Sequence, residues 1–246
     1  MKKLALREAL VRHTRQNRFL FLPLLKFERR LRGFENDIVI DRQTDVVIEG
    51  FFRSANTFAA YAFMQAQPEK ISVAYHTHAP ATIIQAVKWH MPTLVLIRRP
   101  ADTITSLALK HPSTSIEQGY KDYIDFYSAI APYASHYLIA TFNEVTNDFG
   151  SVMDQFNQRF CTNFVRFEHD KQNVAKVYER IERIDRLAEH GDGDLTKMSF
   201  PHSGRSEAKK QMRLRVTVKE FEPLLAEANL VYSRFVELRK EVCHET

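Results

Sequence analysis

The chain has 246 residues, 44% of them hydrophobic and 26% charged, which is ordinary for a soluble globular protein with one large domain or one domain with appendages. Its formal net charge of +5 suits an anionic ligand or surface but is too small to indicate nucleic acid binding by itself. Two distant cysteines, Cys161 and Cys243, form no metal-binding pattern and indicate a reducing compartment. No apolar run is long enough to span a membrane, and arginines interrupt the N-terminal stretch, so we expect a cytoplasmic protein without a signal peptide.

Residues 1–44 are expected to form a basic, partly helical leader ahead of a domain that spans residues 45–246. A weak apolar stripe runs from Leu4 to Val11, with arginines between its members. Two interpretations stay open for this leader. It is either a solvated helix packed on the domain or an arm that makes peripheral contact with a membrane surface or a partner.

From residue 45, strand-like runs alternate with helical stretches. We expect strands at 46–51, 71–75, 93–98 and 137–142, and helices at 56–67, 81–90, 101–110 and 115–132. Such alternation is typical of parallel strands joined by helical crossovers. The nearly continuous apolar run Leu94–Ile97 indicates a strand buried on both faces. The predicted fold class is therefore α/β, with a parallel sheet flanked by helices on both faces.

The C-terminal part is predicted to be mostly helical. Ser115 and Gln118 have the spacing of a capping box at the start of the fourth helix. An apolar face at helical spacing predicts a further helix at about 172–190. Glycines and a proline then predict a loop at 191–205, which is followed by a long helical tail to about residue 240.

The segment that follows the first predicted strand is the most informative part of the chain. It reads Gly50-Phe51-Phe52-Arg53-Ser54-Ala55-Asn56-Thr57-Phe58 and leads into a helix. A strand, a tight turn and a helix N-terminus form an anion site, because backbone N–H groups point at the ligand and the helix dipole favours negative charge. Arg53 adds a planar cation that matches phosphate oxygens. The segment lacks the Gly-x-x-x-x-Gly-Lys-Ser/Thr motif of common ATP and GTP enzymes.

A second candidate element lies at the end of the third predicted strand. Arg98 ends that strand, Pro100 suits the first turn of the next helix, and Ser106 follows about two turns later. An arginine and a serine so placed can converge on one phosphate. The alternative is an arginine at the surface and a serine at the edge of the core.

The third candidate element is His76-Thr77-His78-Ala79-Pro80, directly after the second predicted strand. Alternate residues of an extended segment face the same way, so His76 and His78 can face one cavity. The alternative is two exposed loop histidines. A metal site is not expected, since the sequence offers no third ligand at a helpful spacing.

Together these elements resemble the sulfotransferase family, in order from about residue 45 to the C-terminus. Phe52–Phe58 resembles the family loop that holds the 5′-phosphosulfate of the donor 3′-phosphoadenosine 5′-phosphosulfate. Arg53 falls on the catalytic lysine or arginine of that loop, Thr57 on its second threonine, and Phe58 on a position that is often an adenine-stacking tryptophan.

The other two elements match the family as well. Arg98 and Ser106, eight residues apart, match the pair that holds the donor's 3′-phosphate. His76-x-His78-x-Pro80 looks like the family's Lys-x-His-x-Pro segment, which places His78 on the catalytic base. Near the C-terminus, Ser203 and Arg205 lie in a segment that looks like a divergent form of the late 3′-phosphate loop.

The resemblance implies a P-loop-like sulfotransferase fold and transfer of a sulfuryl group to a hydroxyl or amine of a small-molecule or carbohydrate acceptor, without metal or nucleic acid. It implies that Arg53 and His78 are catalytic. The residues implied to bind the donor are Arg53, Ser54, Ala55, Asn56, Thr57, Phe58, Arg98, Ser106, Ser203 and Arg205. Two alternatives are a small-molecule kinase on a related sheet and a non-catalytic module that binds polyanions or membranes.

The chain departs from the family at three positions. Ala55 replaces a usual glycine, so the loop must either avoid positive φ there or bear strain. Asn56 replaces a threonine, and His76 replaces a lysine, which makes the charge there dependent on pH. Four aromatic residues could line an acceptor cleft, although their helical spacing favours the core, namely Tyr120, Tyr123, Phe126 and Tyr127.

Overall fold

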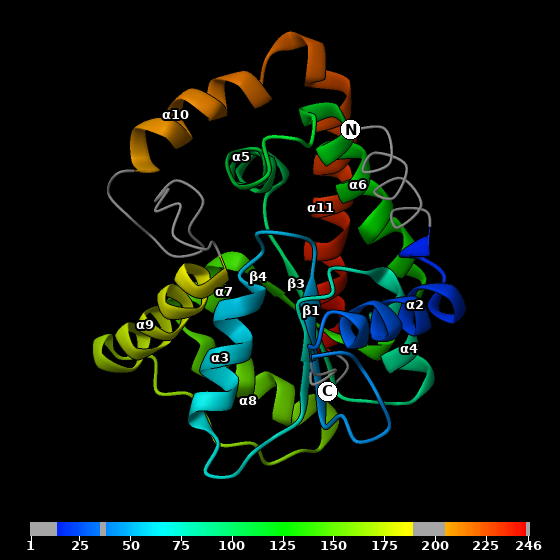
Figure 1. The fold of residues 1–246 in the computed structure, drawn as a ribbon, viewed down its shortest axis with the longest axis vertical. Coiled ribbons are helices and arrows are strands. Elements are labelled where there is room, and N and C mark those ends of the chain that lie inside the picture. Colours follow the sequence, from blue (N-terminus) through cyan, green and yellow to red (C-terminus); the bar gives the residue numbers. More distant parts are fainter. Residues whose placement is uncertain (1–13, 35–37, 189–204, 245–246) are drawn as a thin grey trace.

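The computed structural model describes residues 14–34, 38–188 and 205–244. Within these residues the chain forms a four-stranded parallel sheet with the order β2-β1-β3-β4 (Figure 1). The strands are β1 (Val46–Gly50), β2 (Val73–Tyr75), β3 (Thr93–Ile97) and β4 (Leu138–Thr141). The expected α/β class and the parallel sheet are confirmed.

Helices make up most of the remaining described residues. They are α2 (Arg18–Leu31), α3 (Asn56–Ala66), α4 (Pro80–Lys88), α5 (Pro100–Lys110), α6 (Ile116–Ile130), α7 (Phe142–Asn147), α8 (Phe149–Phe160), α9 (Lys171–Ala188), α10 (Arg205–Val216) and α11 (Glu222–His244), with 3-10 turns η1 (Ala131–His136) and η3 (Lys219–Phe221). The Ser115 side chain caps α6 by accepting the Gln118 N–H, but the Gln118 side chain donates to Asp122, so only half of the predicted capping box forms.

The C-terminal tail is helical, as predicted, but it is not continuous. The tail is instead two helices, α10 and α11, which are separated at residues 217–221. The break follows the β-branched run Val216-Thr217-Val218, whose side chains lose rotamer freedom in a helix. Val218 has extended backbone angles and starts the short turn η3.

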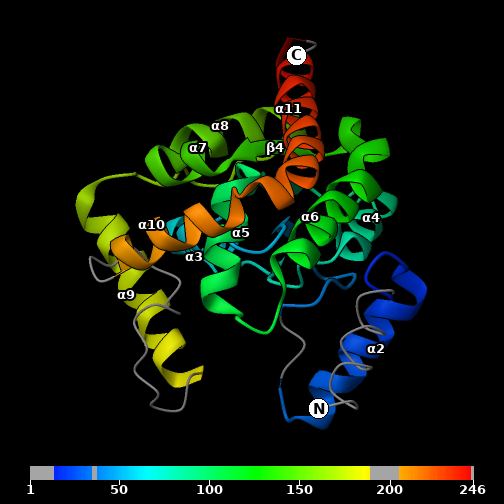
Figure 2. The same cartoon turned by 90° about the horizontal axis from the view of Figure 1, so that it is seen from above.

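Helices cover both faces of the sheet, as expected. On one face α3, α8 and α9 pack around Ile48 and Leu96. On the other face α4, α5, α6 and α11 pack around Val95 and Ile97, and α2 packs on α4. Figure 2 shows α9 and α2 at opposite sides of the molecule. The described part of the leader is therefore a helix that contributes Phe21 and Leu22 to the core.

The aromatic residues of α6 belong to the core. Tyr120, Tyr123, Phe126 and Tyr127 are all at most 3% exposed, so the core interpretation is confirmed. Two of the tyrosine hydroxyl groups also form hydrogen bonds at the ends of β1 and β3. Tyr127 donates to the Leu96 carbonyl at 2.7 Å and accepts the Phe51 N–H at 3.4 Å. Tyr123 donates to the Arg98 carbonyl at 2.9 Å.

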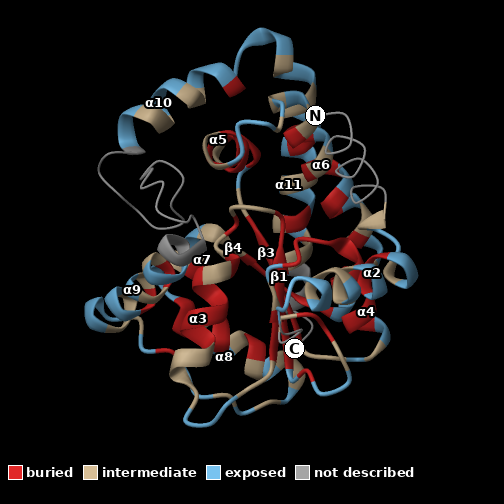
Figure 3. Ribbon diagram, in the orientation of Figure 1, coloured by how far each residue is buried: buried red, intermediate tan, exposed pale blue. Residues whose placement is uncertain are grey.

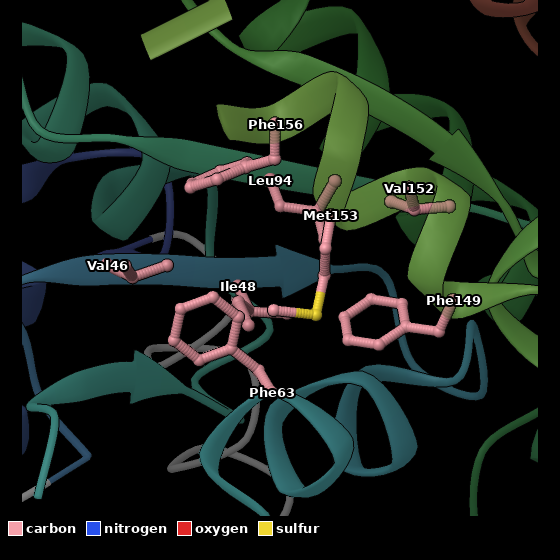
Figure 4. Close-up of a pocket in the computed structure, with 8 residues that line it drawn as sticks. All are labelled: Val46, Ile48, Phe63, Leu94, Phe149, Val152, Met153 and Phe156. Atoms are coloured by element: carbon pink, nitrogen blue, oxygen red, sulfur yellow. The ribbon is translucent and has the colours of Figure 1, made fainter. Parts of the chain in front are cut away.

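One small cavity lies inside the core, between the sheet and helices α3 and α8 (Figure 4). Its volume is about 10 Å³, and its lining is entirely apolar: Val46, Ile48, Phe63, Leu94, Phe149, Val152, Met153 and Phe156. A water molecule needs about this much room together with two or more polar partners. The cavity is therefore a gap in packing and not a ligand site.

Replacing Gly50 by alanine is expected to destabilise the fold by about 1–3 kcal/mol, because it overpacks a closed site. A Cβ atom on Gly50 would lie 2.3 Å from the Leu96 carbonyl oxygen and 2.9 Å from Asn56 Oδ1. Chemical denaturation of the variant measures the loss. The matched control is Gly119→Ala on α6, where the nearest atom would lie at 3.4 Å. Equal stability of the two variants would contradict this account of the contact between β1 and β3.

Candidate anion-binding site

The candidate site lies at the carboxyl edge of the sheet, between β1 and β3. The chain leaves β1 through α3 to reach β2 on one side, and returns through α4 to reach β3 on the other. These two helices lie on opposite faces. In open parallel sheets such a reversal of strand order leaves a crevice at the strand ends, which is where ligands bind.

Three predicted site residues meet in this crevice. Arg53 Nε donates a hydrogen bond to Ser106 Oγ at 2.9 Å, and Arg98 Nη1 donates to the Arg53 carbonyl oxygen at 3.0 Å. The Arg98 guanidinium also stacks on the Phe142 ring, 3.9 Å from its centroid. Two cations and a hydroxyl group therefore lie close together: Arg53 follows β1, Arg98 follows β3, and Ser106 lies on α5.

The first turn of α3 adds backbone donors to this group. No side chain caps the N-terminus of α3, where Ala55 is the preceding residue. Ala55 has φ 75°, and Arg53 has φ 64°. The loop therefore bears the strain that replacing glycine introduces, at a cost of about 1–2 kcal/mol per residue. Such strain next to an uncapped helix N-terminus is typical of a ligand-binding loop.

Other predicted donor-binding residues are buried. Ser54 is fully buried, and the buried Asn56 amide donates within its own loop, to the Phe51 carbonyl at 2.9 Å and the Gly50 carbonyl at 3.3 Å. Thr57 is half-buried, with its Oγ1 at 3.5 Å from His76 Nδ1. These side chains shape the loop that carries Arg53 and leads into the first turn of α3.

Phe58 does not stand at the surface as a stacking residue would. It is 4% exposed, and its ring lies against Phe167, His169 and Tyr178. The first turn of α3 directs this side chain toward α9, where apolar burial is available. A bound base would have to displace protein contacts to stack on it.

Two residues near the C-terminus, Ser203 and Arg205, were predicted to bind the 3′-phosphate of the donor. Ser203 lies outside the described residues, and Arg205 is the first residue of α10. Helix α10 packs on α5, the helix that carries Ser106, and the ion pair of Arg213 with Asp102 joins them (Figure 2). The second half of α10, around Arg213, therefore lies against the helix that carries Ser106.

The sequence analysis missed Glu49, the residue that organises the histidine turn. Glu49 lies on β1 and is fully buried. Its Oε1 accepts the N–H and the hydroxyl of Thr77, both at 2.6 Å, and its Oε2 accepts the His78 N–H at 3.1 Å. Burial raises the pKa of Glu49 to about 7, although these hydrogen bonds oppose the rise. The sequence does contain one sign of this role, since Glu49 is an acidic residue directly after the apolar run Val46–Ile48 of a predicted strand.

The two histidines come together, but not through an extended segment as predicted. His76 has φ 65° and His78 has φ 49°, both left-handed. The physical reason is Glu49, because one carboxylate collects the N–H groups of two successive residues and so bends the chain around itself. The rings of His76 and His78 lie 4.7 Å apart between centroids.

His78 is held in one tautomer by its surroundings. Its Nδ1 lies 3.0 Å from the Gly50 carbonyl, which can only accept. We therefore assign the proton to Nδ1, which leaves Nε2 able to accept one. Burial, followed by the positive charges of His76, Arg15 and Arg53, lowers the pKa of His78 well below its usual value. The imidazole is thus neutral at neutral pH.

Arg15 of the leader also reaches the site, which nothing in the sequence signalled. Its guanidinium lies over the Phe52 ring at 5.1 Å from the centroid, and that ring lies 4.3 Å from the His78 ring. The Arg15 carbonyl accepts the Ala81 N–H at the start of α4. Part of the leader therefore belongs to the wall of the site.

The buried carboxyl of Glu49 predicts a pH dependence of stability. The pKa of Glu49 is about 7 in the folded protein, against an ordinary value of about 4.5. The contribution of this carboxyl group to the free energy of unfolding is therefore fully present below about pH 4.5 and is lost as the pH rises through the folded pKa. Relative to Glu49→Gln, the natural chain should lose about 2–3 kcal/mol between about pH 5 and pH 8. Urea denaturation of both proteins across this range measures the difference. A constant difference would show that the carboxyl is not desolvated.

Comparisons of the chain with protein-family models, with curated proteins and with solved structures found no match. In the part of the chain that the structure describes, no three His, Cys, Asp or Glu side chains gather as metal ligands would. The case for a function therefore rests on the residues of the crevice and on their geometry.

Proposed function

We propose that this chain is a sulfotransferase that moves a sulfuryl group from 3′-phosphoadenosine 5′-phosphosulfate to a hydroxyl or amine of a small-molecule or carbohydrate acceptor. The observation that carries the proposal is the meeting of Arg53, Arg98 and Ser106 beside the uncapped start of α3. These groups come from three segments in the order that the family motifs have.

The arrangement offers two places for phosphate. Arg53 and the first N–H groups of α3 would bind the 5′-phosphosulfate, while Arg98 and Ser106 would bind the 3′-phosphate by charge-assisted hydrogen bonds. In the structure Arg53 bonds Ser106, and Arg98 bonds the Arg53 carbonyl. To fill both places, these donors exchange protein acceptors for phosphate oxygens.

The bound donor would supply an activated sulfuryl group with a phosphate as leaving group. By analogy with phosphoryl transfer, the chain then acts mainly by positioning the reactants and by stabilising charge. Arg53 would stand where negative charge develops on the leaving phosphate. His78, neutral and with Nε2 unprotonated, would accept the proton of the acceptor group.

Titration calorimetry with 3′-phosphoadenosine 5′-phosphate tests the proposal. We expect the folded protein to bind this nucleotide and Arg98→Ala to bind it at least about tenfold more weakly, since a charge-assisted hydrogen bond is lost. Arg99→Ala is the matched control, because Arg99 is exposed and adjacent. If well-folded protein takes up ATP with magnesium but not this nucleotide, a kinase is favoured and the proposal fails.

A further inference from the structure

Helix α2 has two apolar sides, and only one of them is used in the fold. Phe21 and Leu22 are 5% and 7% exposed and pack with α4. On the other side a second apolar set is exposed: Leu20 56%, Leu24 41%, Phe27 60%, Leu31 71% and, just beyond the helix, Phe34 57%. Figure 3 shows this contrast as pale blue along α2 beside the red of α4.

The exposed set forms a single stripe. Leu20, Leu24, Phe27 and Leu31 follow one another at spacings of four, three and four residues. At 3.6 residues per turn they fall within an arc of about 60° on the helix surface. We call these four residues the outer stripe of α2. An unbroken apolar stripe of this kind on the surface marks an interaction site.

The charge of the same segment identifies what would cover the outer stripe. Residues 18–34 contain five basic residues and a single acidic one, Glu28. The whole leader, residues 1–44, has eleven basic and five acidic residues, a net +6, so that the other 202 residues together carry −1 of the chain's +5. Helix α2 therefore combines a net positive charge with exposed leucine and phenylalanine side chains.

A basic helix with an exposed leucine and phenylalanine face suits the interface of an anionic bilayer. The apolar side enters the boundary of the acyl chains, while lysines and arginines meet lipid phosphates. On the helix surface Lys26 and Arg30 both lie along one edge of the outer stripe. Nucleic acid would use the cations but would leave the apolar side chains in water. None of the described helices is both long and apolar enough to cross a bilayer, so contact through α2 would be peripheral.

We propose that the outer stripe of α2, with Lys26 and Arg30 beside it, is a docking face for anionic membrane surfaces. The face lies outside the candidate anion-binding site and does not depend on the function proposed above. Its side chains are exposed, so replacing them leaves the core that Phe21 and Leu22 form intact.

Co-sedimentation of the full chain with vesicles tests this proposal. We expect binding to phosphatidylcholine vesicles that contain phosphatidylglycerol, weaker binding to pure phosphatidylcholine, and release at high salt. Phe27→Ser with Leu31→Ser should lower the partition coefficient by about tenfold or more. Lys26→Gln with Arg30→Gln should do so on the anionic vesicles only.

The matched control is Leu214→Ser with Leu230→Ser, two leucines that are 61% and 73% exposed on α10 and α11. These changes should leave vesicle binding unaltered. The proposal is overturned if the natural chain stays in the supernatant with anionic vesicles at low salt, or if both serine pairs reduce binding equally. It is also overturned if the natural chain is a dimer that Phe27→Ser converts to a monomer, since α2 would then be a self-association face.

Discussion

Arg53→Ala is expected to lower the rate of the proposed sulfuryl transfer by about 10²–10³-fold, which is the usual cost of removing one preorganised donor to developing charge. Arg53 is held by its hydrogen bond to Ser106 at 2.9 Å, and it lies in the loop that leads into the uncapped start of α3. The rate can be followed as release of 3′-phosphoadenosine 5′-phosphate, with water or an added phenol as the acceptor.

Two variants separate this role from general loss of charge. Arg53→Lys keeps a cation at the loop and should retain more activity than Arg53→Ala, although it loses the planar geometry that binds two oxygens. Arg99→Ala removes an exposed cation that directly precedes α5, and it should leave the rate unchanged. If Arg53→Ala and Arg99→Ala had the same rate as the natural chain, Arg53 would have no part in the reaction.

Glu49→Ala is expected to lower the free energy of unfolding by about 3 kcal/mol or more at neutral pH. The substitution leaves the buried N–H groups of Thr77 and His78 without their acceptor, and it removes the carboxylate partner of the Thr77 hydroxyl, which keeps only Thr82 Oγ1 at 2.7 Å. Each unsatisfied buried donor costs about 1–3 kcal/mol. Chemical denaturation followed by circular dichroism measures the change.

Glu49→Gln and Glu117→Ala are the controls for this prediction. Glutamine keeps the shape and one acceptor oxygen, so its cost should be smaller. Glu117 is exposed on α6 and pairs only with the exposed Lys121, so its removal should cost less than about 0.5 kcal/mol. If Glu49→Ala were no more costly than Glu117→Ala, the left-handed turn at His76 and His78 would not depend on this carboxylate.

The order of strands and helices was readable from the sequence because apolar periodicity is a local property. The runs at Val46–Ile48 and Leu94–Ile97 are buried strands. The helices that follow them begin at Asn56 and at Pro100, within one residue of the predicted starts. The same locality explains why the predicted helical tail divides at residues 217–221, where a short β-branched run ends α10.

The sequence by itself determined the α/β class and the alternation of strands and helices, because these depend on residue type and short spacing; from the same short patterns it predicts an anion site at the loop around Arg53. Only the tertiary structure decided that Arg53 contacts Ser106, that Phe58 faces the core, and that Glu49 bends the chain at His78. Those facts depend on contacts between segments tens of residues apart, which are set by packing on a common sheet and not by any local pattern.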